Sequence, residues 1–95
     1  VIIRPSCVGT TIKDPFPGWV DSKGALGGVI FASGMSLLPM IKGEADIIGD
    51  LVPVDVVCNV IVAATAYLVK DSSFRVYQVG TSTSGSTITW RTVLK

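Results

Sequence analysis

Residues 1–19 read VIIRPSCVGTTIKDPFPGW, and this stretch sets the fold class. Residues 1–3 are consecutive β-branched residues, a pattern typical of a parallel strand that is covered on both faces. Pro15 and Pro17 fix the backbone and remove two hydrogen-bond donors, so no strand ladder passes through them. A buried strand that leads into a rigid loop is how α/β proteins bring a ligand-contacting segment to the end of a sheet.

The length and composition indicate part of a larger body. The chain has 95 residues, of which 48% are hydrophobic and 16% charged. That charged share is below the usual quarter, and a small domain has a poor surface-to-volume ratio for burying so much apolar sequence. Such a chain either packs against another body or is part of a larger one, and we expect the second, a fragment with exposed apolar surface where further strands would pair.

Charge and residue usage exclude several functions. The net charge is +1 and the cationic residues are scattered, so nothing favours nucleic acid as a partner. The absence of histidine removes Ser-His and Cys-His catalytic pairs and the commonest zinc ligand, and we expect no metal site. Cys7 and Cys58 are predicted to be buried free thiols in a reducing compartment.

The uncharged stretch over residues 24–41 is predicted to be a core-facing helix rather than a membrane span. Its glycines and Pro39 interrupt it, whereas a span needs about 20 predominantly apolar residues. The helix is expected over 25–38, with Asp21 and Ser22 as a cap.

The second half of the chain predicts a helix between two strands. Residues 51–54 should be extended because a residue before proline avoids the α region, and residues 46–48 could form a short strand. Residues 55–70 form the best predicted helix. Its apolar positions recur at helical spacing, at Val56, Val57, Val60, Ala63, Ala64 and Tyr67.

The last third predicts a strand and a short helix. Residues 74–80 alternate between apolar and polar, as a half-exposed strand does. A final helix, capped by Ser86 or Thr87, should run through Trp90 to Leu94. This order of strands and helices implies mainly parallel pairing in an α/β fold.

Two glycine-rich stretches imitate phosphate-binding motifs without meeting their requirements. Residues 80–87 follow a strand, but Ser86 stands where a P-loop needs lysine, which favours a capped loop. Residues 24–28 follow no strand, so they favour close helix packing over a dinucleotide fingerprint.

Three aspartates, Asp46, Asp50 and Asp55, do not have the spacing of an EF-hand or of one helix face. They are interpreted as a solvated loop carboxylate, a turn residue and a helix-start residue. Asp55 has the strongest claim to a function, because it stands at a strand-to-helix junction in apolar surroundings.

Two segments have both a structural and a functional interpretation. Residues 5–8 are either a strand end or a backbone contact to a cofactor. Residues 16–19 are either an aromatic loop packed on the domain or a lid over an apolar ligand. Loops at the carboxyl ends of strands carry sites in this fold class, so both interpretations stay open.

Three stretches together resemble the fatty acyl-CoA reductases, the male-sterility-type branch of the extended short-chain dehydrogenase/reductases. They are IIRPSCVG at 2–9, KDPFPGWVD at 13–21 and DLVPVDVVCN at 50–59, with a weaker likeness in VYQVGTSTSGSTITW at 76–90. The motifs RPS and VD are shared widely among extended reductases. The combination of PFPGW with DLVPVD is far more specific.

The resemblance implies that residues 1–95 are the C-terminal part of a Rossmann-type, doubly wound, mainly parallel NAD(P)-binding domain. The glycine fingerprint and the Tyr-x-x-x-Lys pair of the family are missing from the chain. Tyr67 and Lys70 are only three positions apart, one short of the motif spacing. The fragment is therefore expected to hold no catalytic residue and to be inactive alone.

The implied activity of the longer protein is reduction of fatty acyl-CoA to fatty alcohol or aldehyde with NADPH. The resemblance implies that Pro5, Ser6 and Val8 contact the nicotinamide end of the cofactor. It implies that Phe16, Pro17 and Trp19 border the acyl or pantetheine passage, and that Asp55 braces the helix beneath it.

The expected partners are fatty acyl-CoA and the remainder of the same reductase domain. The family implies an intracellular, reducing compartment, with the longer protein at a peroxisomal or endoplasmic reticulum membrane. Two alternatives stay open: a thioester reductase domain of a carrier-protein system, and a non-catalytic binding module with the same fold.

Overall fold

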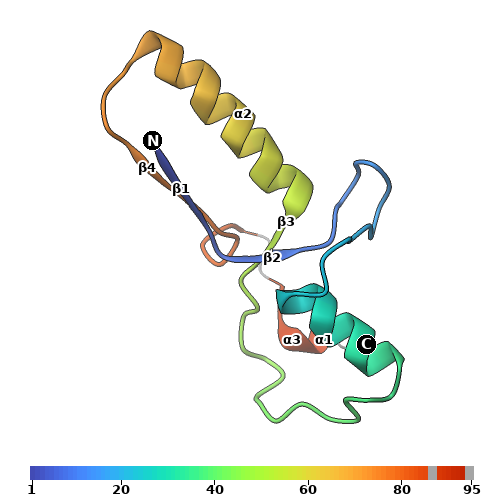
Figure 1. Cartoon of the computed structure of the whole chain (residues 1–95). Coiled ribbons are helices and arrows are strands. Elements are labelled where there is room, and N and C mark those ends of the chain that lie inside the picture. The colour runs from blue at the N-terminus through green and yellow to red at the C-terminus, as the bar shows by residue number, and fades with distance from the viewer. Residues whose placement is uncertain (86–87, 94–95) are drawn as a thin grey trace.

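Short parallel strands and helices alternate along the chain in a computed structural model that describes residues 1–85 and 88–93 (Figure 1). This mixed α/β class agrees with the sequence prediction. The elements are β1 (Ile2–Pro5), β2 (Cys7–Gly9), α1 (Ala25–Gly34), β3 (Leu51–Pro53), α2 (Val54–Lys70), β4 (Val76–Val79) and α3 (Trp90–Val93).

The strands form two separate parallel pairs, so the prediction of parallel pairing is confirmed. β1 pairs with β4 in a register that runs from Ile2↔Val76 to Pro5↔Val79. β2 pairs with β3 from Cys7↔Leu51 to Gly9↔Pro53. The segment from β1 to β2 is thus one extended stretch: its first part pairs with β4 and its second part with β3.

The molecule is elongated, with principal extents of 50 × 26 × 19 Å. Figure 1 shows α2 lying along β1 and β4, while α1 and α3 lie beyond β2. A long connection between α1 and β3 loops around that second end. The β2–β3 pair lies between the part that contains α2 and the part that contains α1 and α3 (Figure 1).

A small core holds α2 against the strands. Val52, Val57 and Val79 form a buried cluster, and partly buried apolar residues pack against it: Ile3, Val8, Val56 and Val60. Val52 is only 1% exposed. Because β3 continues directly into α2, burial of this one strand also fixes where the helix begins.

Helix α2 matches its prediction and begins one residue earlier, at Val54. Asp55 lies in its first turn and Lys70 in its last, where each charge suits the helix dipole. Of the predicted apolar face, Val57 and Ala64 are buried, whereas Tyr67 remains exposed.

Helix α1 is shorter than predicted, because it ends at Gly34 rather than at residue 38. Ser36 has a φ of 58°, a left-handed conformation that cannot continue the helix. The predicted cap at residues 21–22 is also wrong. Gly24 occupies the N-cap position, and its N–H donates to the Ser22 hydroxyl at 3.1 Å.

The glycines of α1 allow close packing, as predicted. A Cβ at Gly27 would collide with the backbone carbonyl oxygen of Ser22, and one at Gly28 with that of Lys23. The chain that enters α1 therefore lies directly against its first turn.

Several predictions about burial and local structure are wrong. Ile2 is 47% exposed, so β1 is not covered on both faces by the described residues. Cys7 and Cys58 are free but exposed rather than buried. The proposed strand at residues 46–48 is a single antiparallel bridge between Ile48 and Thr89.

Exposed apolar surface is extensive, as expected from the composition. It includes β1, the second half of α1 with the residue that follows it, and the outer side of α2, with Ile2, Ile30, Met35, Ile61, Val62 and Val69 among the exposed side chains. The predicted caps Ser86 and Thr87 and the predicted helix end at Leu94 lie outside the described residues. No helix in residues 1–85 and 88–93 is long and apolar enough to cross a membrane.

Val52→Ala should destabilise the intact protein by about 2 kcal/mol, because it leaves a cavity in a small, fully buried site. Denaturant unfolding measures this change. Val69→Ala is the matched control, since Val69 is 87% exposed, and it should change stability by less than about 0.5 kcal/mol. Equal effects of the two substitutions would contradict the assignment of the core.

Candidate functional site

The extended segment from β1 to β2 changes its partner at Ser6. The Ser6 N–H donates to the carbonyl oxygen of Val79 at 2.9 Å, which extends the pairing with β4. The next N–H, of Cys7, donates to the carbonyl oxygen of Asp50 at 3.3 Å, which begins the pairing with β3. Ligands of parallel α/β sheets bind at the carboxyl ends of strands where neighbours diverge.

A polar crevice of about 290 Å³ lies where β1 and β4 end. Its lining combines one guanidinium, one carboxylate, an amide and several hydroxyls, from Arg4, Pro5, Ser6, Asp50, Gln78, Val79, Gly80, Ser82 and Thr83. Arg4 and Gln78 are register partners across the strand pair. The crevice can therefore both donate and accept hydrogen bonds.

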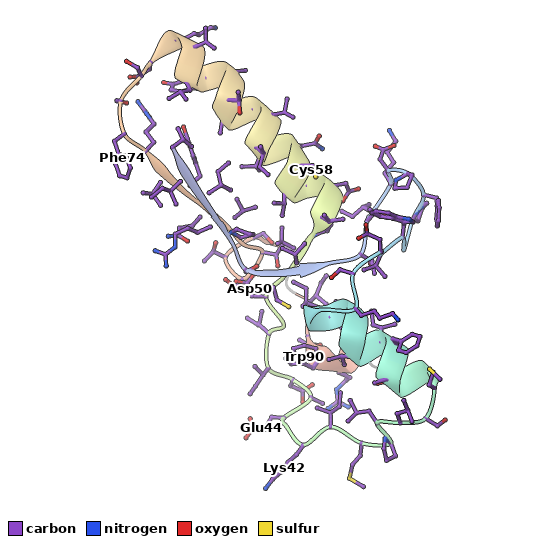
Figure 2. The ribbon with its side chains drawn as sticks, viewed as in Figure 1. Lys42, Glu44, Asp50, Cys58, Phe74 and Trp90 are labelled. Atoms are coloured by element: carbon purple, nitrogen blue, oxygen red, sulfur yellow. The ribbon has the colours of Figure 1, made fainter. Side chains whose placement is uncertain are left out.

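Asp50 joins the segments around this crevice (Figure 2). Its Oδ1 accepts the backbone N–H of Thr81 at 2.7 Å and of Ser82 at 3.1 Å. The Ser6 hydroxyl donates to the same oxygen at 3.2 Å. The Thr81 N–H contributes most to holding the pKa of Asp50 below its ordinary value, so the carboxylate is ionised at neutral pH.

A second, mainly apolar cavity of about 300 Å³ lies on the β2 side of Ser6. Val8, Trp19 and Val54 contribute its large apolar surfaces. The rest of the lining comes from the end of β2, the chain that enters α1 and the first turn of that helix: Gly9, Val20, Asp21, Ser22, Gly24 and Gly27. This cavity suits a hydrocarbon or another apolar group.

The loop that follows β2 runs over residues 11–19, and hydrogen bonds between Thr11 and Trp19 hold its two ends together. The Thr11 N–H donates to the Trp19 carbonyl oxygen at 3.1 Å. The buried Thr11 hydroxyl donates to the Phe16 carbonyl oxygen at 2.6 Å and accepts the Trp19 N–H at 3.1 Å. Gly18 has a φ of 83°, a conformation that favours glycine and that turns the chain back toward Thr11.

Asp55 holds the other side of this loop. Its Oδ2 accepts the backbone N–H groups of Ile12 at 3.0 Å, Lys13 at 2.9 Å and Asp14 at 3.5 Å. Burial acts to raise the pKa of Asp55, but these donors and the Val56 N–H together hold it below its ordinary value. Asp55 therefore links α2 to the loop that carries Trp19.

The structure divides the residues predicted to form the site. Pro5 and Ser6 line the polar crevice, whereas Val8 lines the apolar cavity together with Trp19. Phe16, 58% exposed, and Pro17 lie at the loop tip and line neither.

Sequence reasoning missed Asp50 and Thr11. The sequence predicts Asp50 only as a turn residue, although its place directly before a buried strand is a signal that draws attention to it. Asp46 is the exposed loop carboxylate that the sequence predicts, and it also forms a two-point ion pair with Arg91, at 2.7 and 2.9 Å. Across the described ranges 1–85 and 88–93, no cluster of three metal-ligating side chains occurs.

Comparisons with known proteins place the chain among NAD-binding sequences. The family model described as "Male sterility protein", one of the NAD-binding models, matches residues 1–61. Fatty acyl-CoA reductase 1 of Homo sapiens is 46% identical over 66 residues, which are 70% of this chain and 13% of that protein.

Two further relatives extend this similarity. Fatty acyl-CoA reductase 1 of Gallus gallus is 46% identical over the same length, 70% of this chain and 13% of its own. Fatty acyl-CoA reductase 2 of Homo sapiens is 41% identical over 87 residues, 90% of this chain and 16% of that protein. The chain thus spans only 13–16% of the length of these relatives. No solved structure matches it.

Asp55→Ala should release residues 12–14 from α2, because three backbone N–H groups lose their common acceptor. We expect the amide protection factors of Ile12 and Lys13 in the intact protein to fall by about tenfold, measured by hydrogen exchange. Asp14→Ala, which removes a carboxylate from the same loop, is the matched control. Unchanged protection in Asp55→Ala would show that Asp55 does not hold the loop.

The same anchoring should depend on pH. A carboxyl whose pKa is lowered by folding contributes fully above the unfolded pKa of about 3.9 and loses its contribution as the pH falls through the lower folded pKa. Protection factors of Ile12 and Lys13, corrected for intrinsic exchange, should therefore persist to about pH 4 and fall below it. Loss of protection already near pH 6 would contradict this.

Proposed function

The chain belongs to the male sterility protein family, and on that premise we propose that it forms part of an NADPH-dependent fatty acyl-CoA reductase. The longer enzyme would reduce a long-chain fatty acyl-CoA to the fatty alcohol, or stop at the aldehyde. The observation that carries this proposal is the family match over residues 1–61, which include every site residue predicted from the sequence, from Pro5 to Asp55. The names of the similar reductases support the substrate class.

We further propose that residues 1–95 are the C-terminal part of the reductase domain and are inactive alone. The sequence has neither the glycine fingerprint nor a Tyr-x-x-x-Lys pair, so both would be supplied by the rest of the domain. The exposed apolar residues of β1 and α2 support this, because a helix that is apolar on most sides is normally buried.

The two cavities suggest how this part of the domain would divide the ligands. The polar crevice at the ends of β1 and β4 fits the polar end of a dinucleotide, with Pro5 and Ser6 beside the nicotinamide. The apolar cavity fits the acyl or pantetheine passage, with Val8 and Trp19 as walls. The bend at Ser6 would then lie between cofactor and substrate.

The fit rests on features of the crevice itself. Its side chains supply both donors and acceptors, which an amide and a ribose require, and it opens at the carboxyl ends of two parallel strands. When bound there, the nicotinamide cofactor would supply hydride for reduction of the thioester.

The residues of this chain would bind and orient rather than transfer protons. Asp55 would keep the Phe16–Trp19 segment in place through the backbone of residues 12–14. Trp19 would exclude water from the acyl passage, and the exposed Phe16 and Pro17 would border its outer end. The free cysteines agree with a reducing compartment.

The activity is tested with the full-length protein, NADPH and a long-chain acyl-CoA. We expect oxidation of NADPH, release of coenzyme A thiol and a fatty alcohol or aldehyde identified by mass spectrometry. NADH and the free fatty acid are the controls, and both should support little turnover. If neither NADPH nor NADH gave a reduced product, the proposed function would be contradicted.

Trp19→Ala should raise the KM for acyl-CoA by about tenfold, equivalent to about 1.4 kcal/mol of lost apolar contact, and lower kcat much less. Steady-state kinetics of the full-length enzyme measure both constants. Phe74→Ala is the matched aromatic control, since Phe74 is 74% exposed and precedes β4, at the other end of the molecule from α1 (Figure 2). An unchanged KM in Trp19→Ala would count against its place in the acyl passage.

A further inference from the structure

We propose that Asp50 is a positioning residue of the polar crevice and thereby sets the affinity for the nicotinamide cofactor. This inference rests on the proposed function, in which Pro5 and Ser6 lie beside the nicotinamide. Asp50 would act through the segments that it holds, without transferring a proton or contacting the reacting atoms.

The position of Asp50 gives it this influence. It directly precedes β3, and its own carbonyl oxygen accepts the Cys7 N–H that starts the pairing of β2 with β3. Its side chain turns the other way along the bend and accepts the Ser6 hydroxyl. One residue therefore fixes both sides of the place where the extended segment changes partner.

The same carboxylate holds the loop that leaves β4. Thr81 and Ser82 both donate their backbone N–H groups to Oδ1, at 2.7 and 3.1 Å. The Thr81 hydroxyl lies 3.2 Å from that oxygen and 3.0 Å from the Leu51 carbonyl oxygen, and its single proton can serve either. Ser82 itself lines the crevice, so this wall is placed by Asp50.

Gly80 shows how closely the carboxylate lies against β4. A Cβ built on Gly80 would lie 3.1 Å from Oδ2 and 3.3 Å from Oδ1 of Asp50. A Cβ at position 80 would therefore push the carboxylate away by a few tenths of an ångström and lengthen the hydrogen bonds that it accepts. This offers a way to move Asp50 without removing its charge.

Hydrogen bonds from several N–H and O–H donors to one ionised carboxylate are stronger than bonds between neutral groups. If Asp50 loses its charge, the Ser6 side and the Thr81–Ser82 side of the crevice are no longer held to one point. The apolar cavity has a different anchor, Asp55, so its geometry should change little. Cofactor and substrate binding should therefore respond differently.

The experiment compares Asp50→Asn with Asp71→Asn in the full-length enzyme. Asp71 is a matched control, because it also accepts a backbone N–H in a turn next to β4, that of Ser73 at 3.0 Å, but at the opposite end of that strand. NADPH affinity is measured by direct titration as well as by KM, and the KM for acyl-CoA and kcat are measured alongside.

We expect Asp50→Asn to weaken NADPH binding by about tenfold while the KM for acyl-CoA stays within about twofold. Asp71→Asn should change both constants by less than about twofold. The proposal would be overturned if NADPH binding were unchanged in Asp50→Asn, because Asp50 would then have no role in it. It would also be overturned if the NADPH dissociation constant and the KM for acyl-CoA rose in parallel, or if Asp71→Asn had an equal effect, because either result indicates a general loss of structure.

Two milder variants decide the matter if Asp50→Asn does not fold. Ser6→Ala removes one donor at the bend, and Gly80→Ala shifts the intact carboxylate by a few tenths of an ångström. Both should weaken NADPH binding more than acyl-CoA binding, and failure of both to do so would overturn the proposal. If the wild-type enzyme binds NADPH but reduces no acyl-CoA, the proposed substrate fails, whereas the NADPH titrations still test the role of Asp50.

Discussion

At Ser6 the backbone leaves β4 as its parallel neighbour and takes β3 instead, and the rest of the molecule is arranged around this change. The Ser6 N–H completes one ladder, and the Cys7 N–H begins the other. Two neighbouring residues thus bond to strands from different parts of the chain. The bend separates a polar crevice from an apolar cavity, which gives one segment contact with two kinds of ligand.

Ionised carboxylates, rather than a large core, hold the loops on either side of this bend. The buried apolar cluster is small and lies mainly between α2 and the strands. Asp50 and Asp55 each accept backbone N–H groups from a loop far away in sequence. Because such bonds satisfy donors that strands and helices cannot, they fix loop geometry without requiring further apolar burial.

The regular elements could be predicted because their signals are local. Helical spacing identified α2, the proline at position 53 identified an extended segment before it, and alternation identified β4. Glycine spacing in α1 indicated close packing, but the end of that helix could not be read. The helix ends at Gly34, but glycine also occurs inside α1, and Ser36 adopts a left-handed conformation that serine rarely takes, so the residue types do not single out this end.

The candidate site was harder to predict, since its contacts are long-range. The donors to Asp50 lie 31, 32 and 44 residues away in sequence, and the loop donors to Asp55 lie 41 to 43 residues away. The place of Asp50 directly before a buried strand draws attention to the residue, but no local pattern identifies the distant loop that donates to it. The apolar run at residues 1–3 predicts a strand that is covered on both faces, but Ile2 is 47% exposed among the described residues.

The division of ligands across the bend is tested most directly by hydrogen exchange of the full-length protein with NADPH and, separately, with a long-chain acyl-CoA. NADPH should slow exchange in residues 80–85 and at Ser6, whereas acyl-CoA should slow exchange in residues 11–24. Protection of the same segments by both ligands, or no change at residues 80–85 with NADPH, would contradict this arrangement.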